Sequence, residues 1–322
     1  MRHMRTSARL ASIAAACAVS ALAALPVQAQ QTRLTYFTGP TGGSWIPIGG
    51  AFKSLWEKAI PGLSIENRPG AGLINMKAIE EDKAQIGMGN MISTVDALKG
   101  VGQGITKPYT NVCHLANIYP QVQQITVRAD QGINSVADLK GKSVGTLPRG
   151  NTTEVVANWI MEAAGVSYKD TAKMNFVSIA DQANMFKDGQ ISASLIISTM
   201  PTGGIMDMAN SRPIKMLDVT DDIFAKLVAK NSGFSRITIP KSTYPGMDRD
   251  NLTVQFPAHV IVSCKLPDDL VYQMAKAMTE ALPDLASVNA VFKGATVADF
   301  GAKVAVKVHP GAARYFKERG VQ

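Results

Sequence analysis

The sequence predicts an α/β fold built from two lobes, each holding a mostly parallel sheet covered by helices. From Leu34 onward, apolar strand candidates alternate with helical patterns, an order typical of parallel sheets. A strand that leads through a polar or glycine-rich loop into an amphipathic helix occurs twice, around residues 38–50 and around residues 147–154. The 293 residues that follow a leader-like segment are enough for two such lobes.

Residues 1–29 are predicted to be a secretory signal peptide. They carry three arginines within the first nine residues, an alanine-rich apolar run over residues 10–25, and a small-residue ending, Val27-Gln28-Ala29. This order is typical of a leader that is cleaved, here near Ala29, and it places the mature chain in the periplasm.

The charge of the chain is mildly basic. There are 33 Lys and Arg against 25 Asp and Glu, a net charge of +8, and removal of the three leader arginines leaves +5. Because the basic residues are scattered and aromatic residues make up only 6% of the chain, we exclude a nucleic-acid binder. The small positive excess is compatible with an anionic ligand.

The first strand-to-helix junction, Thr38–Gly50, lies between a strand at Leu34–Phe37 and a helix whose apolar positions recur up to Ala59. Ser44 is a candidate N-cap, and Pro47 suits a first helical turn. Unpaired N–H groups at such a helix start, backed by the helix dipole, favour an anion. The glycines also fit a simple tight turn, and both interpretations stay open.

The second junction follows a helical turn, a tight turn and a strand predicted over Val136–Leu147. Asn151 and Glu154 have the spacing of a capping box, so Asn151 is a helix cap, a ligand contact or both. Arg149 is either a solvated loop charge or a carboxylate ligand beside the start of the next helix.

Four strand exits are candidates for a binding site, because ligands of parallel sheets gather outside the carboxyl ends of the strands. They lie near Thr41, Asn90, Arg149 and Thr199. The other predicted elements are strands at Leu63–Asn67, Gln85–Asn90, Gln124–Arg128, Asn175–Ile179 and Ser194–Ser198, and a helix at Gly72–Asp82.

A second crossing between the lobes is predicted at Thr253–Ser263, which is β-like although Pro257 interrupts it. The helix that starts at Pro267 and Asp268 should pack on the first lobe. We therefore assign residues 30–121 and 258–322 to the first lobe and residues 122–257 to the second. The hinge is expected at Tyr119–Gln123 and Phe256–His259.

Motifs of enzymes and metal sites are missing from the sequence. Gly141-Lys142-Ser143 lacks the upstream glycine of a P-loop, and no Gly-x-Ser-x-Gly nucleophile elbow occurs. The three mature histidines are isolated in the sequence, and we interpret each as structural: His114, His259 and His309. Cys113 and Cys264 either form a disulfide or remain buried thiols. We expect no catalytic residue, cofactor or metal.

Three segments resemble the TAXI family of TRAP-transporter solute receptors: Thr38-Gly39-Pro40-Thr41-Gly42-Gly43-Ser44, Leu139-Lys140-Gly141-Lys142-Ser143-Val144, and the terminal run from His309 to Gly320. Tyr244-Pro245-Gly246 adds to the likeness, which extends over essentially the whole mature chain. The resemblance implies a type II periplasmic-binding-protein fold with a solute cleft between its lobes. It also implies a receptor that delivers a small carboxylate, such as glutamate, glutamine or 2-oxoglutarate, to a TRAP permease.

The resemblance maps the Thr-Gly-Gly element of the family onto Thr41, Gly42 and Gly43, and a second-lobe loop onto residues 149–153. This chain departs from the pattern in carrying Pro148-Arg149-Gly150-Asn151 in that loop, and Asn90 where relatives often have an acidic residue. Both departures favour an organic acid over an amino acid.

The expected function is therefore a monomeric receptor that captures a small organic anion and passes it to a TRAP permease. The alternatives are an amino-acid receptor of the same family, a receptor for an ABC importer or a sensor, and a secreted hydrolase. The predicted substrate-binding residues are Thr41, Gly42, Gly43, Ser44, Trp45, Asn90, Arg149, Asn151, Thr152 and Thr199.

Overall fold

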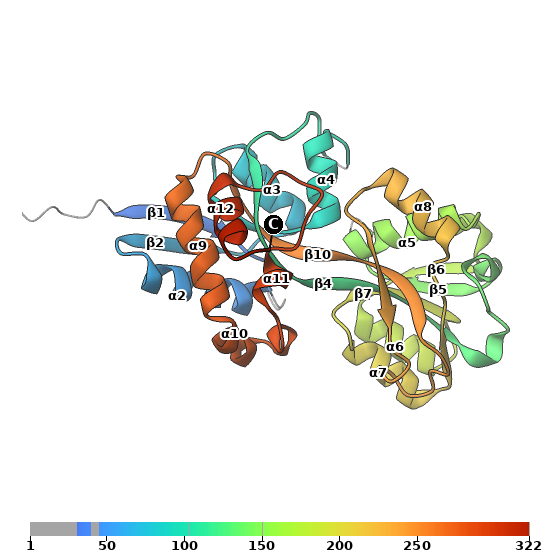
Figure 1. Ribbon diagram of the computed structural model, residues 1–322. Coiled ribbons are helices and arrows are strands. Elements are labelled where there is room, and N and C mark those ends of the chain that lie inside the picture. Colours follow the sequence, from blue (N-terminus) through green and yellow to red (C-terminus); the bar gives the residue numbers. More distant parts are fainter. Residues whose placement is uncertain (1–30, 40–44, 103, 150, 322) are drawn as a thin grey trace, which may run out of the picture.

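Two α/β lobes lie side by side, joined by two long strands (Figure 1). This arrangement comes from a computed structural model that describes residues 31–39, 45–102, 104–149 and 151–321. It confirms the predicted fold class. The signal-peptide prediction and the predicted site residues Thr41, Gly42, Gly43 and Ser44 lie outside the described residues.

The first lobe holds one end of the sheet, in the order β2-β1-β3-β10-β4, with β1 parallel to both β2 and β3. Its strands are β1 (Thr32–Phe37), β2 (Leu63–Arg68), β3 (Ile86–Asn90) and the adjoining ends of β4 (Val112–Arg128) and β10 (Asn251–Ser263). Its helices are α2 (Trp45–Ala59), α3 (Gly72–Glu80), α4 (Met91–Lys99), α9 (Asp268–Glu280), α10 (Leu282–Val288), η4 (Ala290–Phe292), α11 (Val297–Phe300) and α12 (Pro310–Glu318).

The second lobe continues the sheet as β4-β7-β5-β6, while β8 pairs with β4 and β9 pairs with β10. Its further strands are β5 (Ser143–Thr146), β6 (Lys173–Phe176), β7 (Ala193–Ser198), β8 (Ile214–Met216) and β9 (Ser235–Ile239). Its helices are η1 (Ala129–Gln131), η2 (Val136–Leu139), α5 (Thr152–Ala163), η3 (Tyr168–Asp170), α6 (Ile179–Lys187), α7 (Gly203–Ser211) and α8 (Asp221–Lys230).

The core of the first lobe explains why the predicted helix α2 packs against the sheet with one apolar face. Phe52 and Trp56 are fully buried, and the Trp56 indole donates to the Met274 carbonyl of α9 at 3.0 Å. Gly49 lets α2 approach β1 closely, because a Cβ there would lie 2.3 Å from the Thr38 methyl group. The prediction that the helix after Pro267 packs on the first lobe is confirmed.

Two predicted strands differ from the observed ones. β4 begins at Val112, far before the predicted start at Gln124, and its first eight residues are all buried, so they show no polar alternation. β6 ends at Phe176 because the Ser178 hydroxyl accepts from the backbone N–H of Asp181 and caps a new helix at Ile179.

The two crossing strands change lobes at a pair of prolines. Pro257 of β10 lies opposite Pro120 of β4, and neither residue has an N–H to donate to the ladder. Tyr119 belongs to the hydrophobic core of the first lobe, whereas Phe256 belongs to a core of the second lobe. The segments predicted as hinge strands therefore pair with each other where the two cores meet, and hinge motion itself stays a prediction.

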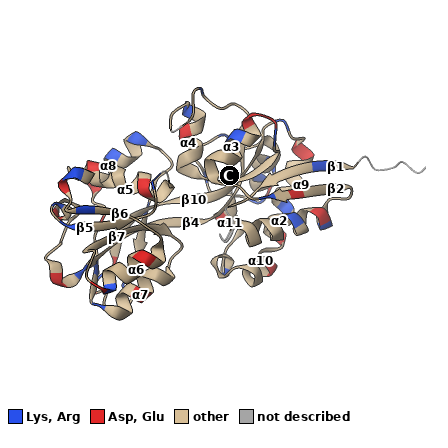
Figure 2. Cartoon of the chain, turned by 180° about the vertical axis from the view of Figure 1, so that it is seen from behind, with Lys and Arg blue, Asp and Glu red and all other residues tan. Residues whose placement is uncertain are grey.

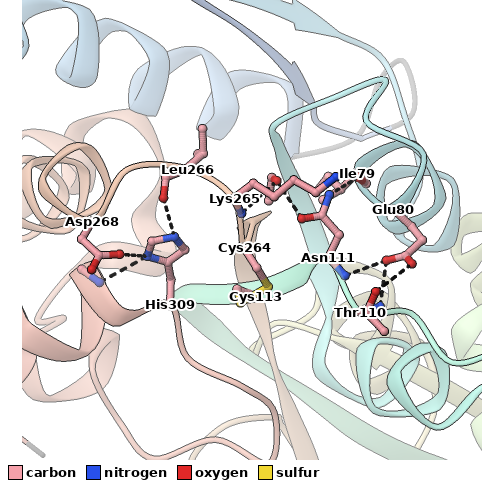
Figure 3. Close-up of a disulfide and its surroundings, with 12 residues drawn as sticks. Ile79, Glu80, Thr110, Asn111, Cys113, Cys264, Lys265, Leu266, Asp268 and His309 are labelled. Carbon is pink, nitrogen blue, oxygen red and sulfur yellow. Dashed lines mark hydrogen bonds and ion pairs between the residues drawn. A yellow bond between two sulfur atoms is a disulfide. The ribbon is translucent and has the colours of Figure 1, made fainter.

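A disulfide joins Cys113 to Cys264, which answers the question that the sequence left open (Figure 3). It links the start of β4 to the residue after the end of β10, within the first lobe. Nearby, the His309 ring accepts from the Gly311 N–H as the N-cap of α12 and faces the Leu266 carbonyl at 3.1 Å. His309 is structural, as predicted.

Charged residues lie mainly on the outer helices of both lobes, while the crossing strands between the lobes contain few (Figure 2). In the part of the chain that the structure describes, none of the helices has the length and apolar character needed to cross a membrane.

Candidate functional site

A cavity of about 800 Å³ lies between the lobes. The first lobe contributes the beginnings of α2, α3 and α4, and the second contributes the beginning of α5 and the exit of β7. Tyr119, Gln121 and Phe256 of the crossing strands also line it. Both lobes therefore supply its walls, and its volume lies within the range typical of small-molecule sites.

Four helix N-termini meet at this cavity. Its lining includes Trp45, Gly72 and Thr152, which are the first residues of α2, α3 and α5, and Ile92 in the first turn of α4. The first N–H groups of a helix have no partner within the helix, and the helix dipole adds partial positive charge there. Among the described residues, the starts of α3 and α4 have no side-chain cap hydrogen bond. The arrangement suits an anion.

Basic side chains do not contribute to the described lining, whose single charged residue is Asp96. The half-buried Asp96 carboxylate accepts from Asn231 Nδ2 at 2.8 Å, and burial raises the pKa of this carboxyl. The remaining polar lining consists of amides and hydroxyls. Positive potential in the described cavity therefore comes from peptide groups rather than from Lys, Arg or His.

Asn90 connects three parts of the molecule. It is the last residue of β3 and the N-cap of α4, and its Nδ2 donates to Thr152 Oγ1 in the second lobe at 3.2 Å. Its Oδ1 accepts from Gln121 of crossing strand β4. A second contact between lobes is made by Asn231, whose Nδ2 also donates to the Ile92 carbonyl at 2.8 Å.

Aromatic rings form part of the apolar wall of the cavity, beside aliphatic side chains. The Trp45 indole donates to the Tyr119 hydroxyl at 2.9 Å, which fixes both rings beside the crossing strands. Across the cavity, Trp159 and Phe256 both pack against Phe234, with ring centroids 6.2 and 5.9 Å apart. The cavity thus offers a polar end at the helix starts and a large apolar surface.

Five of the predicted site residues line this cavity: Trp45, Asn90, Asn151, Thr152 and Thr199. Asn151 also caps α5, because its side-chain oxygen accepts from the Thr153 N–H at 2.9 Å. The cap part of that interpretation is confirmed, and solute contact stays a prediction.

Arg149 lies outside the cavity wall. Its guanidinium carbon lies 4.2 Å from the centroid of the Phe176 ring and 5.9 Å from that of Tyr168. A cation is attracted to the face of an aromatic ring at such distances. Packing on β6 therefore draws this exposed side chain to the flank of the α5 N-terminus, where it faces rings rather than the cavity.

The exit loop of β7, which contributes Thr199, is held by a buried network. Tyr244 donates its hydroxyl proton to Gln124 Oε1 and accepts from the Thr202 N–H at 2.7 Å. Gln124 Nε2 in turn donates to Thr202 Oγ1 at 2.9 Å. In the sequence, Tyr244 belongs only to the short motif Tyr244-Pro245-Gly246, and Gln124 only begins a predicted strand. The local pattern therefore gives no sign that these residues support the loop.

Two of the histidines that are isolated in the sequence meet in the folded structure. The Nδ1 atoms of His114 and His259 lie 2.9 Å apart, and the rings are stacked and fully buried. They are 145 residues apart in the chain, so no spacing motif could reveal the pair. Among the described residues, no group of three or more His, Cys, Asp or Glu is arranged to hold a metal ion.

Residues 37–320 match the NMT1-like family. Among solved structures, the fold is similar to that of a TctC solute-binding protein from Polaromonas, with 15% identity, 92% of this chain and 100% of that chain covered, and a TM-score of 0.52. It is also similar to XAC2383 from Xanthomonas citri, which was solved bound to ATP, with 12% identity, coverage of 90% and 97%, and a TM-score of 0.52. These similarities show a shared fold.

Proposed function

We propose that this chain, which belongs to the NMT1-like family, is an extracytoplasmic receptor that captures a small organic anion between its two lobes. The anion is a carboxylate, an oxo-acid or a dicarboxylate. The observation that carries the proposal is the meeting of four helix N-termini at one cavity between the lobes. The aligned helix dipoles, together with the starts of α3 and α4 that lack a side-chain cap, favour a negative group there without a basic side chain.

Capture proceeds by closure of the lobes around the solute. Solute held at the helix starts of the first lobe also meets Thr152 and Thr199 of the second lobe, so contacts to both lobes stabilise the closed state. The rotation takes place at the paired prolines, Pro120 and Pro257, where the ladder lacks two donors. In this proposal the first lobe comprises residues 30–121 and 258–322, and the second lobe comprises residues 122–257.

Delivery to a TRAP permease is the proposed next step, and it rests on the resemblance to TAXI receptors. The signal-peptide pattern of residues 1–29 supports a periplasmic protein, and we propose that it acts as a monomer. A receptor for an ABC importer is the alternative with the same fold. A permease gene adjacent to the coding sequence would favour the TRAP partner, and an adjacent ATPase gene would favour the ABC importer.

An amino-acid ligand is the second candidate, and Asp96 is the observation that favours it. This carboxylate lines the cavity and would face the ammonium group of an amino acid whose carboxylate lies at the helix starts. Its bond from Asn231 and the raised pKa of its carboxyl both reduce its value as an ammonium partner. The simple organic acid is therefore preferred.

A thermal-shift screen tests the proposal, because a solute that binds only the folded state raises apparent stability, by about 2.7 kcal/mol at a hundredfold excess over Kd. Dicarboxylates, oxo-acids, amino acids and aromatic acids are compared with their neutral amides as matched controls. We expect at least one acid to raise the melting temperature and its amide to leave it unchanged. Equal shifts with acid and amide would overturn the anion assignment, and turnover of an ester or amide would overturn the receptor function.

A further inference from the structure

The buried histidine pair belongs to a longer row of hydrogen bonds that ends at the cavity. His114 of β4 faces His259 of β10 through their Nδ1 atoms, and His259 Nε2 lies 2.8 Å from Thr94 Oγ1 in α4. The Thr94 hydroxyl in turn lies 3.2 Å from the Asn90 carbonyl oxygen. The row therefore runs from the middle of the first lobe to the residue that bridges the lobes.

The partners at each end decide the direction of these bonds. A carbonyl oxygen only accepts, so Thr94 donates to Asn90 and accepts the proton of His259 Nε2. His259 Nδ1 is then an acceptor, and His114 Nδ1 carries the proton between the rings. This leaves His114 Nε2 as a bare lone pair, which agrees with its having no hydrogen-bond partner among the described residues. The opposite direction would bury an unpaired N–H at that atom, which is rarer in native proteins.

Both rings stay neutral in this row. Each is fully buried, and burial lowers the pKa of His114 to about 3, while burial and the neighbouring ring lower the pKa of His259 well below its usual range. Two neutral rings with opposite tautomers satisfy the Nδ1 contact, because one ring donates and the other accepts. A charged pair would place two donors against each other.

We propose that His114, His259 and Thr94 form a neutral chain of hydrogen bonds with one fixed direction, and that this chain positions Asn90 for bridging the lobes. All three are positioning residues, since the side chain in the cavity is that of Asn90. The side-chain amide of Asn90 is bonded at both ends, because its Oδ1 accepts from Gln121 and its Nδ2 donates to Thr152. The Asn90 backbone must therefore be held in place by other residues. The benefit for solute capture rests on the proposed receptor function, whereas the chain itself does not.

The position of the chain in the sheet supports this role. His259 lies between two register shifts in the β4–β10 ladder, at Ala258/His259 and Val260/Ile261. A β-bulge leaves a residue unpaired and disrupts the ladder locally, so a side-chain bond between the strands adds a constraint where backbone pairing is irregular. The bond from His114 to His259 joins the two strands within this irregular stretch.

Nitrogen-15 NMR of the ligand-free, histidine-labelled protein tests the direction. At neutral pH we expect His114 to carry its proton on Nδ1 and His259 on Nε2, with neither ring titrating between about pH 5 and 8, as expected for groups kept neutral by burial. A proton on His114 Nε2, or charging of either ring in that interval, would overturn the proposal.

Three threonine variants test the positioning of Asn90. Thr94→Val removes the hydroxyl and should shift the side-chain amide resonances of Asn90, whereas Thr94→Ser should restore them. Thr279→Val is the matched control, because Thr279 is also a buried helical threonine whose hydroxyl bonds a carbonyl four residues earlier, at 3.1 Å, in α9. Unchanged Asn90 signals in Thr94→Val, or equal changes in Thr279→Val, would contradict the role. These measurements need no solute, so they fail or succeed separately from the receptor function.

Discussion

At the scale of single residues, the uncharged polar groups that line the cavity are peptide N–H groups, side-chain amides and hydroxyls. The Arg149 side chain lies outside the cavity wall. The Arg149 side chain is engaged by the Phe176 ring, while Asn90 spans the cleft. Arg149 lies beside the start of α5 but outside the cavity lining, so its charge reaches the cavity only from a distance. Its effect on anion capture should therefore be long-range and sensitive to salt.

Arg149→Ala should weaken binding of the acid found in the thermal-shift screen only slightly. The expected loss is about 0.2–1 kcal/mol, typical of an exposed charge, and it should vanish at high ionic strength. Calorimetric titration at low and high salt measures it. Arg149→Lys, which retains the charge, is the control. A hundredfold loss that persists at high salt would show that Arg149 clamps the carboxylate directly.

The buried histidines predict an acid-sensitive fold. Unfolded His114 takes up a proton below about pH 6.5, whereas folded His114 stays neutral down to about pH 3, so its contribution to stability is present above pH 6.5 and is lost between these values. His259 acts in the same direction. The free energy of unfolding should fall by about 1.4 kcal/mol per pH unit for each ring. Denaturant titrations at several pH values measure this slope, which His114→Asn should reduce.

At the scale of elements, the regular spacing of apolar residues and the helix caps allowed several helices and strands to be predicted from the sequence. Helix α2 and strand β1 follow from spacing of apolar residues, and α5 follows from its cap at Asn151. The first half of β4 could not be predicted as a strand. It is buried on both faces, so polar and apolar residues do not alternate, and it includes the polar residues His114 and Asn117. Edge strands β8 and β9 are short and carry little pattern.

The disulfide should stabilise the junction of β4 and β10. It closes a chain separation of 151 residues, and a cross-link over so long a loop restricts the unfolded state. We expect Cys113→Ala/Cys264→Ala to lose about 2–5 kcal/mol of unfolding free energy while retaining the native circular dichroism spectrum. Guanidinium titration of the variant against the oxidised wild type measures the loss. Equal midpoints for the two proteins would exclude a stabilising bond.

At the scale of the whole molecule, side-chain hydrogen bonds join the two lobes across the cavity. The bonds of Asn90 to Thr152 and of Asn231 to Ile92 cross the cleft, and each contributes about 1 kcal/mol at most if it resembles other neutral hydrogen bonds. Under the proposed closure around a solute, hydrogen bonds this weak would add little to the free-energy difference between the closed and open states. A solute that contacts both lobes then shifts the population.

Asn90→Ala should open the ligand-free protein. Loss of its bonds to Thr152 and Gln121 removes one bridge, so the radius of gyration from solution scattering should rise above that of the wild type. Asn158→Ala is the control, since Asn158 lies on α5 and its amide bonds the neighbouring side chain of Glu162. An unchanged radius in Asn90→Ala would mean that this bridge has no effect on closure.

The location of the cavity could be predicted from sequence better than its lining. Asn90 and Thr199, which lie at the carboxyl ends of two strands, line the cavity, because the carboxyl ends of parallel strands lie at the same edge of a sheet. The direction of Arg149 depends on the Phe176 ring of a later strand. Asp96 meets Asn231 across 135 residues, so contacts of this range are set by tertiary packing and leave no local signal.

A binding cavity whose positive end consists of peptide N–H groups has a consequence for its working range. Unlike a histidine, a peptide group does not gain or lose a proton between mildly acidic and mildly basic conditions, so this end of the cavity keeps its donors unchanged. The protonation state of the solute, together with that of the Asp96 carboxyl, then sets how capture varies with acidity. A receptor built in this way would keep its affinity for a strong acid in a mildly acidic medium, over the pH range in which the protein stays folded.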